Sequence, residues 1–455
     1  MKNALLPGLG GPMGRHARPR GVWFNPLPWA FLVATVLFLM LFVRHVPCVQ
    51  TVENQELDVY LKLCYSDIQT MFLGQGFGRG ASPLGAESML FSPLVAAAIL
   101  LTRKSATLLF DAPIRRSATL AQQIDASVTF FGITALGLFV CLLIWVASMA
   151  WLGRRRPGRT SWDALLVAAS PIVLAAGLIS WDLIPVAFTA LGLAQFARGR
   201  LLEAGIVLGL AASAGTMPIG VILAVLVVTG LRGGARRALV FGGAAVVTFV
   251  AVHLPLLLAN FNHVYLYYHG QINRDTGYGS LWYLMQLITG YTVRSAGSLA
   301  FAVLLLALGV FIAYLYVTQK KPRIGSMVAA VILATTLLGP AFTPQTSLWL
   351  LLAVVLARPY TPELIALTLT QVGYYVAIWG WLGGSLTSAQ NGPYLLYWLA
   401  IILHAAVQLW ILIEVVIDIA QPYRDMLRTP DAPDPIGGVL NDRLIGYERP
   451  TARMR

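Results

Sequence analysis

The stretch WAFLVATVLFLMLFV, residues Trp29–Val43, decides the fold class of this chain. It contains no charged residue, and similar uninterrupted apolar runs recur over the whole length of 455 residues. Hydrophobic residues make up 58% of the chain and charged residues only 11%, whereas a soluble domain carries about 25% charged residues. Runs of about 20 apolar residues are typical of helices that cross a membrane, and the strands of a membrane barrel would alternate instead. The pattern therefore predicts an all-α polytopic membrane protein.

We expect about 12–13 transmembrane helices. Several candidate spans are only about 15 residues long and are interrupted by prolines or polar residues, as in broken helices that line a cavity. The candidate spans are residues 28–46, 88–103, 127–152, 162–178, 182–197, 202–215, 218–231, 236–258, 296–317, 324–340, 346–358, 361–382 and 394–420.

The apolar runs also divide the chain into three parts. Residues 1–27 are predicted as a cytoplasmic N-terminal segment, and 28–420 as one membrane domain with a first extracytoplasmic loop at 47–87. Residues 421–455 are predicted as a flexible cytoplasmic tail, because they are rich in Pro and Asp. No small-residue cleavage site follows the first apolar run, so we interpret that run as a retained span and not as a signal peptide.

The positive net charge of +13 is distributed in short clusters between the apolar runs. Cytoplasmic loops look like this under the positive-inside rule, so we expect a plasma-membrane protein and no nucleic-acid partner. Thirteen crossings would leave the two termini on opposite sides, so residues 88–103 are either re-entrant or followed by a hidden crossing within 105–126. The clusters are Arg15–Arg20, Arg154–Arg159, Arg198–Arg200, Arg232–Arg237 and Lys320–Arg323.

The first outer loop contains the stretch LDVYLKLCYSDIQTMF, residues 57–72, which is too short and too charged to cross the membrane. Its helical spacing predicts an amphipathic helix on the outer membrane surface. Asp67 and Asp58 fall on the two borders of the apolar side. A carboxylate there could act as a general base, or it could be a solvated acid paired with Lys62. The apolar positions are Leu57, Leu61, Cys64, Ile68 and Phe72.

Three cysteines occur in the chain. Cys48 and Cys64 both follow the first span, where an oxidising outside would permit a disulfide. The alternative is two unpaired thiols, because the sequence does not fix their geometry. Cys141 lies within a candidate span and is interpreted as an inert apolar residue.

Other polar residues gather in the turns that we place outside. Glu87 precedes an apolar run and could be a helix N-terminal acid. Asp182, in the stretch ISWDLIP, could cap the following helix or face a polar cavity. Gln345, in the stretch FTPQTSLW, stands at the head of a span, where capping is the simplest role.

The richest outer loop contains NRDTGYGSLWY, with Arg274, Asp275 and Trp282. Arginine suits a phosphate because its planar fork offers paired donors. Aromatic rings such as Trp282 belong to the interfacial belt of membrane proteins and also stack on sugars. We expect no metal site, because His263 and His269 are six residues apart and do not share a helix face. Together the outer turns suit a lipid-linked phosphate donor and a hydroxylated acceptor.

The stretches YLKLCYSDI, ISWDLIPVAFTALG, NRDTGYGSLWY and FTPQTSLW, in that order, resemble actinobacterial integral-membrane glycosyltransferases of the GT-C superfamily. The likeness is to glycosyltransferase family 87, the polyprenyl-phosphate-mannose-dependent type, and it covers nearly the whole chain. It implies a GT-C-like fold and the transfer of a sugar, with mannose the first candidate, from a polyprenyl phosphate to a cell-envelope glycolipid or glycan, with inversion. It implies no cofactor and no metal.

The resemblance also assigns roles to residues. Asp67 takes the place of the catalytic base, with Asp58 as the competing candidate. The substrate-binding positions that it implies are Glu87, Asp182, Arg274, Asp275, Trp282 and Gln345.

The chain departs from the family pattern at two places. GTMP stands at 215–218 where family members often have K-x-x-P, and GPAFTPQ stands at 339–345 where they often have NK-x-x-SPQ. Two lysines that could hold the donor phosphate are therefore absent. Either Arg274 serves alone, or the donor differs, or catalysis has been lost. The rival interpretations are an inactive scaffold with a protein partner in an envelope-synthesis complex, and a transporter of lipids or solutes.

Overall fold

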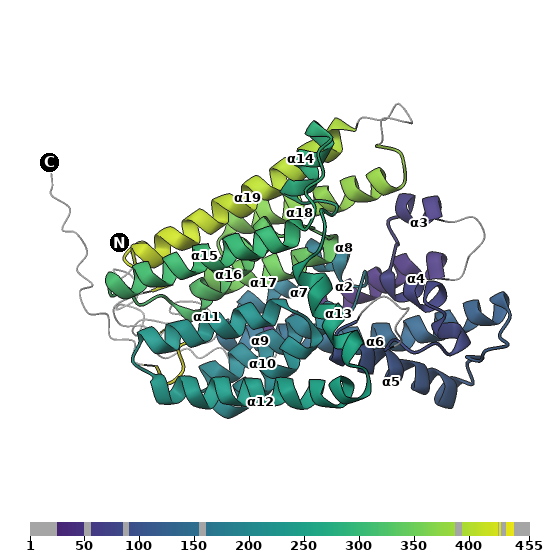
Figure 1. Ribbon diagram of the computed structural model, residues 1–455, viewed down its shortest axis with the longest axis horizontal. Helices are drawn as coiled ribbons and strands as arrows, with labels where there is room; N and C mark the ends of the chain where they lie inside the picture. Colours follow the sequence, from purple (N-terminus) through teal and green to yellow (C-terminus); the bar gives the residue numbers. More distant parts are fainter. Residues whose placement is uncertain are drawn as a thin grey trace, which may run out of the picture.

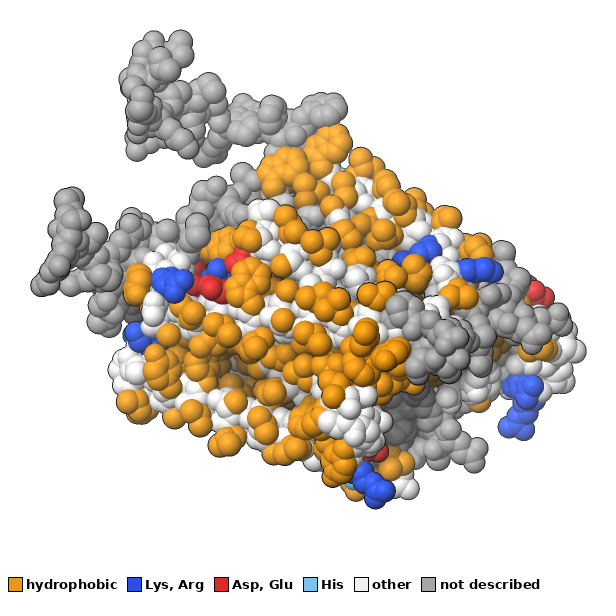
Figure 2. Space-filling model, turned by 90° about the horizontal axis from the view of Figure 1, so that it is seen from above, with side chains coloured by type: hydrophobic (Ala, Val, Ile, Leu, Met, Phe, Trp, Pro, Cys, Tyr) orange, Lys and Arg blue, Asp and Glu red, His pale blue; other side chains and the backbone are white. Residues whose placement is uncertain are grey.

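The computed structural model describes residues 25–49, 56–84, 91–153, 161–386, 394–425, 427–428 and 434–440. Within these ranges the chain is all helical and contains no strand. Most helices run side by side along the long axis of the molecule (Figure 1). Hydrophobic side chains cover a broad middle belt of the face in Figure 2, and the charged side chains in view lie on either side of it. The prediction of an all-α polytopic membrane protein is confirmed.

Seven of the described helices are long and apolar enough to cross a membrane. They are α2 (Pro26–Val49), α5 (Pro93–Phe110), α6 (Leu120–Gly153), α12 (Ala235–Ala259), α15 (Ala296–Val317), α18 (Thr361–Leu382) and α19 (Leu395–Ala420). The shorter apolar segments contain α7 (Leu165–Ala168), α8 (Pro171–Ala176), α9 (Leu183–Ala197), α10 (Leu201–Ala214), α11 (Met217–Leu231), α16 (Ile324–Leu338) and α17 (Ser347–Ala357). The remaining elements are α3 (Glu56–Leu61), α4 (Asp67–Gly74), α13 (Phe261–Ile272), α14 (Leu281–Thr289) and the short 3-10 helices η3 (Phe77–Arg79), η4 (Ser161–Ala164) and η5 (Pro344–Thr346).

The helices pack in two groups that meet along the middle of the bundle. One group contains α2, α6, α9, α10 and α12, and the other contains α16, α17, α18 and α19. Contacts of α11 with α16 and of α17 with α9 join the groups. The hydrophobic core is therefore continuous from one group of helices to the other.

Polar contacts between distant segments occur at two opposite ends of the bundle, which we call the Asp67 end and the Arg323 end. At the Asp67 end, the Asp67 backbone N–H donates to Ile179 O over 2.7 Å. At the Arg323 end, Arg232 Nη2 donates to Pro322 O over 2.7 Å. Such contacts show which end of a helix lies at the Asp67 end and which lies at the Arg323 end.

Contacts at the two ends of the bundle place the α5–α6 hairpin. Ser92, just before α5, donates from Oγ to Ala214 O at the Asp67 end of α10 over 2.9 Å. The following helix, α6, ends at the opposite end, where the Arg198 guanidinium lies 4.6 Å from the Trp151 ring. The α5–α6 hairpin projects beyond α9 and α10 at the Asp67 end (Figure 1).

The prediction of one amphipathic helix over residues 57–72 is wrong. The stretch forms α3 and α4, separated by a turn in which Leu63 has the left-handed φ of 56°. Ser66 begins α4, because its hydroxyl accepts from Ile68 N over 3.3 Å as an N-cap. Ile68 and Phe72 are buried as the spacing predicts, whereas Leu61 is 56% exposed.

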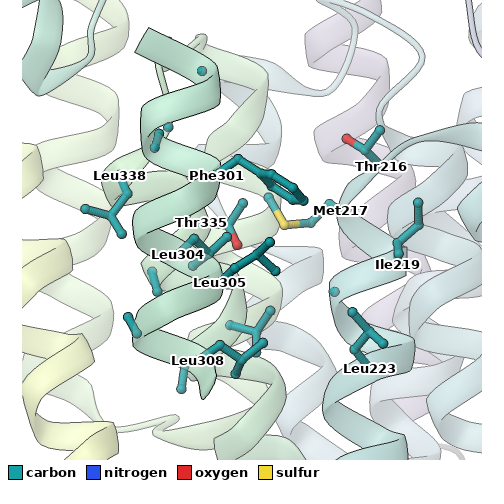
Figure 3. A pocket seen from close by; sticks show the side chains of 18 of the residues that line it. Thr216, Met217, Ile219, Leu223, Phe301, Leu304, Leu305, Leu308, Thr335 and Leu338 are labelled. Atoms are coloured by element: carbon teal, nitrogen blue, oxygen red, sulfur yellow. The ribbon is translucent and has the colours of Figure 1, made fainter. Parts of the chain in front are cut away.

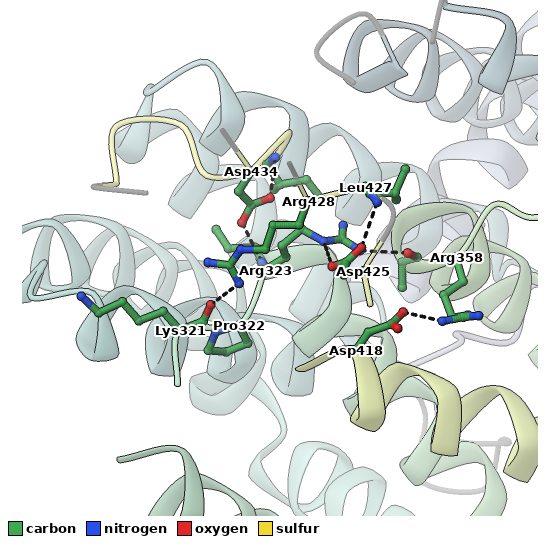
Figure 4. Close-up of polar contacts among 12 residues, drawn as sticks. Lys321, Pro322, Arg323, Arg358, Asp418, Asp425, Leu427, Arg428 and Asp434 are labelled. Atoms are coloured by element: carbon green, nitrogen blue, oxygen red, sulfur yellow. Dashed lines mark hydrogen bonds and ion pairs between the residues drawn. The ribbon is translucent and has the colours of Figure 1, made fainter. Parts of the chain in front are cut away.

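The prediction of a flexible tail is wrong for the part of 421–440 that the structure describes (Figure 4). Asp425 forms a buried ion pair with Arg323, and Asp434 forms one with Arg232 over 3.1 Å. Asp434 also accepts from Ile324 N over 2.9 Å and so caps α16. Acidic tail residues pair with arginines buried at the helix ends, so the tail packs.

A neighbouring ion cluster ties together the next three helices at the Arg323 end. Arg358, which follows α17, pairs with Glu363 of α18 over 2.8 Å and with Asp418 of α19. Arg323 Nη2 donates to Ala357 O at the end of α17 over 3.0 Å. The Arg323 end is therefore a connected network of ion pairs.

Replacing Asp434 by Asn should destabilise the protein, because Arg232 would stay buried without its ionic partner. Breaking such a buried pair costs about 3 kcal/mol. The measurement is the thermal midpoint of the detergent-solubilised protein.

The control is Glu203→Gln, which removes an exposed ion pair with Arg200. That variant should melt within error of the wild type, because exposed pairs contribute about 0–1 kcal/mol. A midpoint for Asp434→Asn equal to that of Glu203→Gln would contradict a stabilising role for the tail.

Candidate functional site

The turn from Leu63 to Asp67 is fixed from several sides. A disulfide joins Cys64 to Cys48 of α2, with 6.2 Å between the two Cα atoms. The Tyr375 hydroxyl of α18 donates to Leu63 O over 2.7 Å. A left-handed residue without glycine costs free energy and persists only where the surroundings hold it. The number of restraints on this turn marks it as a candidate functional site.

The other side of the turn is fixed to the segment between α8 and α9. Ser66 Oγ donates to Leu178 O over 2.7 Å, and the Asp67 N–H donates to Ile179 O over 2.7 Å. Asp182 follows in the same segment, just before α9. The first loop and the α8–α9 turn are thus held together by backbone contacts.

These contacts bring Asp67 and Asp182 together, although they are far apart in the sequence. The pKa of Asp67 is raised to about 6, because burial and the Asp182 charge, which raise it, outweigh the Tyr65 hydrogen bond, which lowers it. Burial also raises the pKa of Asp182, which is opposed by hydrogen bonds from Ser180 and Trp349. Adjacent carboxylates with raised pKa values are typical of acid–base sites.

Aromatic rings surround the pair. Tyr65 packs against Tyr60 and Trp379, with ring centroids 5.2 Å and 5.1 Å away. The Tyr65 hydroxyl donates to Asp67 Oδ1 over 2.9 Å. On the Asp182 side, the pKa of Tyr267 is raised to about 12, because burial and the Asp182 charge outweigh the lowering effect of a hydrogen bond with Ser92. Tyr267 belongs to α13, so this helix forms a wall of the site.

A cavity of about 580 Å³ begins beside this wall. It lies between α11, α15 and α16 (Figure 3), and nearly all its lining is apolar. Tyr268, the neighbour of Tyr267 on α13, contributes to the lining, and so does Thr216 at the start of α11. The cavity therefore runs from the Asp67 end into the bundle. Representative lining residues are Met217, Leu223, Phe301, Leu305, Leu308 and Ala334.

Arg274 lies near this cavity and not among the groups that act on Asp67. Its carbonyl accepts from the N–H of Gly297, which lines the cavity, over 2.8 Å. Among the described residues, its guanidinium has no hydrogen-bond or ion-pair partner. Asp275 accepts from Ser295 N over 2.8 Å and so holds the start of α15.

The remaining candidates lie at the edges of the site. Trp282 donates its indole N–H to Leu338 O, at the end of α16, over 2.8 Å. Gln345 lies in η5, and the N-cap of α17 is Thr346, so the capping role expected for Gln345 is wrong. Asp58 lies in α3, but its side chain is outside the described part of the chain, as is the whole of Glu87.

Sequence reasoning did not assign Tyr65, Tyr267 or Trp349 to the candidate site. The signal for Tyr65 was its place two residues before Asp67 in the stretch CYSDI. The other two lie in segments whose packing against Asp182 only the structure reveals. Within the described ranges, no group of three or more His, Cys, Asp or Glu side chains could hold a metal.

The fold and the site define a multi-pass, all-helical membrane protein with a polar site at one end of the bundle. No protein-family model matches the chain, and no curated protein matches it.

Replacing both Cys48 and Cys64 by Ala should lower the thermal midpoint, because the disulfide closes a loop with a sequence separation of 16. Such a cross-link stabilises by about 3 kcal/mol in the chain-entropy view. The midpoint of the wild type should also fall in reductant, whereas that of the double variant should not change.

Cys141→Ala is the matched control, because Cys141 is not in a disulfide. It should keep both the wild-type midpoint and the response to reductant. A double variant as stable as Cys141→Ala would show that the disulfide does not hold the turn.

Proposed function

We propose that the protein is a GT-C-type membrane glycosyltransferase. It transfers a sugar, with mannose the first candidate, from a polyprenyl phosphate to a cell-envelope glycolipid or glycan. The reaction takes place on the outer side of the plasma membrane, where the positive-inside rule puts the Asp67 end. The observation that carries this proposal is the restrained Asp67–Asp182 pair beside an apolar cavity, with α13 contributing to both.

Asp67 is the proposed general base. A base with a pKa near the working pH combines a large ionised fraction with useful basicity, and a pKa of about 6 meets this condition. The acceptor hydroxyl attacks the anomeric carbon while its proton passes to Asp67. The bond from that carbon to the phosphate oxygen breaks, and polyprenyl phosphate leaves. One such displacement inverts the anomeric carbon.

The cavity suits the tail of the donor. Its lining is apolar, and each methylene that it shields contributes about 0.8 kcal/mol. Arg274 is adjacent to the cavity lining and has no ionic partner among the described side chains. It is therefore the proposed partner of the donor phosphate, in place of the two absent lysines.

Replacing Asp67 by Asn should lower sugar transfer about 100- to 10,000-fold, because the acceptor proton loses its base. The measurement is transfer from a labelled polyprenyl-phosphate sugar to acceptors in membranes. Asp125→Asn on α6, which changes an exposed carboxylate, is the matched control and should transfer at the wild-type rate. Undiminished transfer by Asp67→Asn would remove Asp67 from the mechanism.

Replacing Ala334 by Trp should raise the KM for a long-chain donor at least about tenfold, because the ring would displace several methylenes from the cavity. A donor with a single isoprene unit should be used equally well by the variant and the wild type. Steady-state kinetics with both donors make the comparison.

Val310→Trp places the same ring on the outer face of α15, where Val310 is 62% exposed, and should leave both KM values unchanged. Equal effects of Ala334→Trp on the long and short donors would contradict a tail-binding cavity.

A lipid transporter is the second candidate, favoured by the same cavity. Movement of a labelled lipid across proteoliposomes that is blocked by Ala334→Trp and unaffected by Asp67→Asn would support transport over glycosyl transfer.

A further inference from the structure

We infer that Tyr65 is a positioning residue whose hydroxyl orients the Asp67 carboxylate and keeps it ionised beside Asp182. The inference rests on the proposed function for its consequence in catalysis, but the contact itself can be tested without any activity.

The geometry fixes the phenol in place. Tyr65 Oη donates to Asp67 Oδ1 over 2.9 Å, and no other side-chain hydrogen bond to Asp67 occurs within the described ranges. The Tyr65 ring stacks on Tyr60 and tilts against Trp379, which is only 3% exposed. Tyr60 and Trp379 also stack on one another, with centroids 5.5 Å apart. The three rings leave the Tyr65 hydroxyl little freedom to turn away from Asp67.

Three elements bring further titratable or charged groups toward Tyr65 and Asp67. The α8–α9 turn brings Asp182, α3 brings Tyr60, and α2 brings Arg44 and His45. Arg44 does not neutralise the pair, because Nη2 donates to Ala175 O over 3.1 Å and its guanidinium lies 5.5 Å from the Tyr375 ring of α18. Asp182 is the charged group that acts on Asp67.

Two opposing effects act on the protonation state of Asp67. Burial and the Asp182 charge favour the protonated form of Asp67, whereas the Tyr65 hydroxyl favours the ionised form. A base must be ionised before it accepts a proton, so the hydroxyl maintains the active form of Asp67 at neutral pH. It also orients Oδ1, which leaves the second oxygen of the carboxylate for the acceptor.

The first test compares Tyr65→Phe with Tyr60→Phe, which removes a hydroxyl from the same ring stack without removing the bond to Asp67. Removing the hydrogen bond should raise the acid-side midpoint of the pH–rate profile by about one pH unit. At pH 5.5 the Tyr65→Phe rate should be about tenfold below wild type, and at pH 8.5 the two rates should converge. Tyr60→Phe should keep the wild-type midpoint. An equal loss at every pH would assign Tyr65 a structural role and overturn the inference.

The second test needs no sugar transfer. The pKa of Asp67 in the folded state lies above its ordinary value, so the folded state binds the extra proton. The stability contribution of Asp67 is therefore complete at low pH and is lost as pH rises toward about 6. The measurement is the thermal midpoint of the wild type minus the thermal midpoint of Asp67→Asn, from pH 4 to pH 8. This difference should fall as the pH rises toward about 6.

The same difference is then measured between Tyr65→Phe and the double variant Tyr65→Phe/Asp67→Asn. Its fall should extend to a pH about one unit higher than in the wild-type background. Identical curves in the two backgrounds would overturn the role of Tyr65 whether or not the protein transfers sugar. Absence of transfer in every variant, together with a displaced stability curve, would overturn the proposed function and leave the Tyr65–Asp67 coupling in place.

Discussion

Hydrocarbon offers no hydrogen bonds, and this constraint organises the whole molecule. Backbone polar groups are paired within helices, and the charged side chains with long-range partners lie at the two ends of the bundle. At the Arg323 end, Arg232 and Arg323 are buried in ion pairs with Asp434 and Asp425. The Asp67 end retains two neighbouring carboxylates and an arginine without an ionic partner among the described side chains. The two ends therefore differ in whether their buried charged groups are paired with opposite charges.

The charged groups at the two ends therefore have different roles. The buried ion pairs at the Arg323 end stabilise the helix ends. The Asp67–Asp182 pair keeps two like charges near one another, which costs free energy unless protons, hydrogen bonds or a ligand compensate. The disulfide, the backbone contacts to Leu178 and Ile179 and the aromatic stack maintain that arrangement. In the proposed function, such restraint would hold the site ready before its substrate arrives.

The sequence predicted the fold class well, because apolar runs report directly on burial in lipid. It also named Asp67 and Asp182, since acids are rare in such a chain. It failed for residues 57–72, where periodicity suggested one helix and the cap at Ser66 and the left-handed Leu63 produce two. It failed for the tail, because the composition around Asp425 and Asp434 resembles a disordered segment until buried arginines are found opposite. The contributions of Tyr267 and Trp349 depend on helix packing, which local pattern does not encode.

The tail contacts also impose an order on biogenesis. Arg232 and Arg323 leave the ribosome well before the aspartates that neutralise them. Until Asp425 and Asp434 have been translated, the ends of α11 and α16 at the Arg323 end have guanidinium groups without these carboxylate partners, and burying such groups unpaired is costly. The last helices can insert, but the bundle can close at that end only when the final part of the ion network arrives. The segment that carries Asp425 and Asp434 is thus needed before the ends of α11 and α16 can form their buried ion pairs.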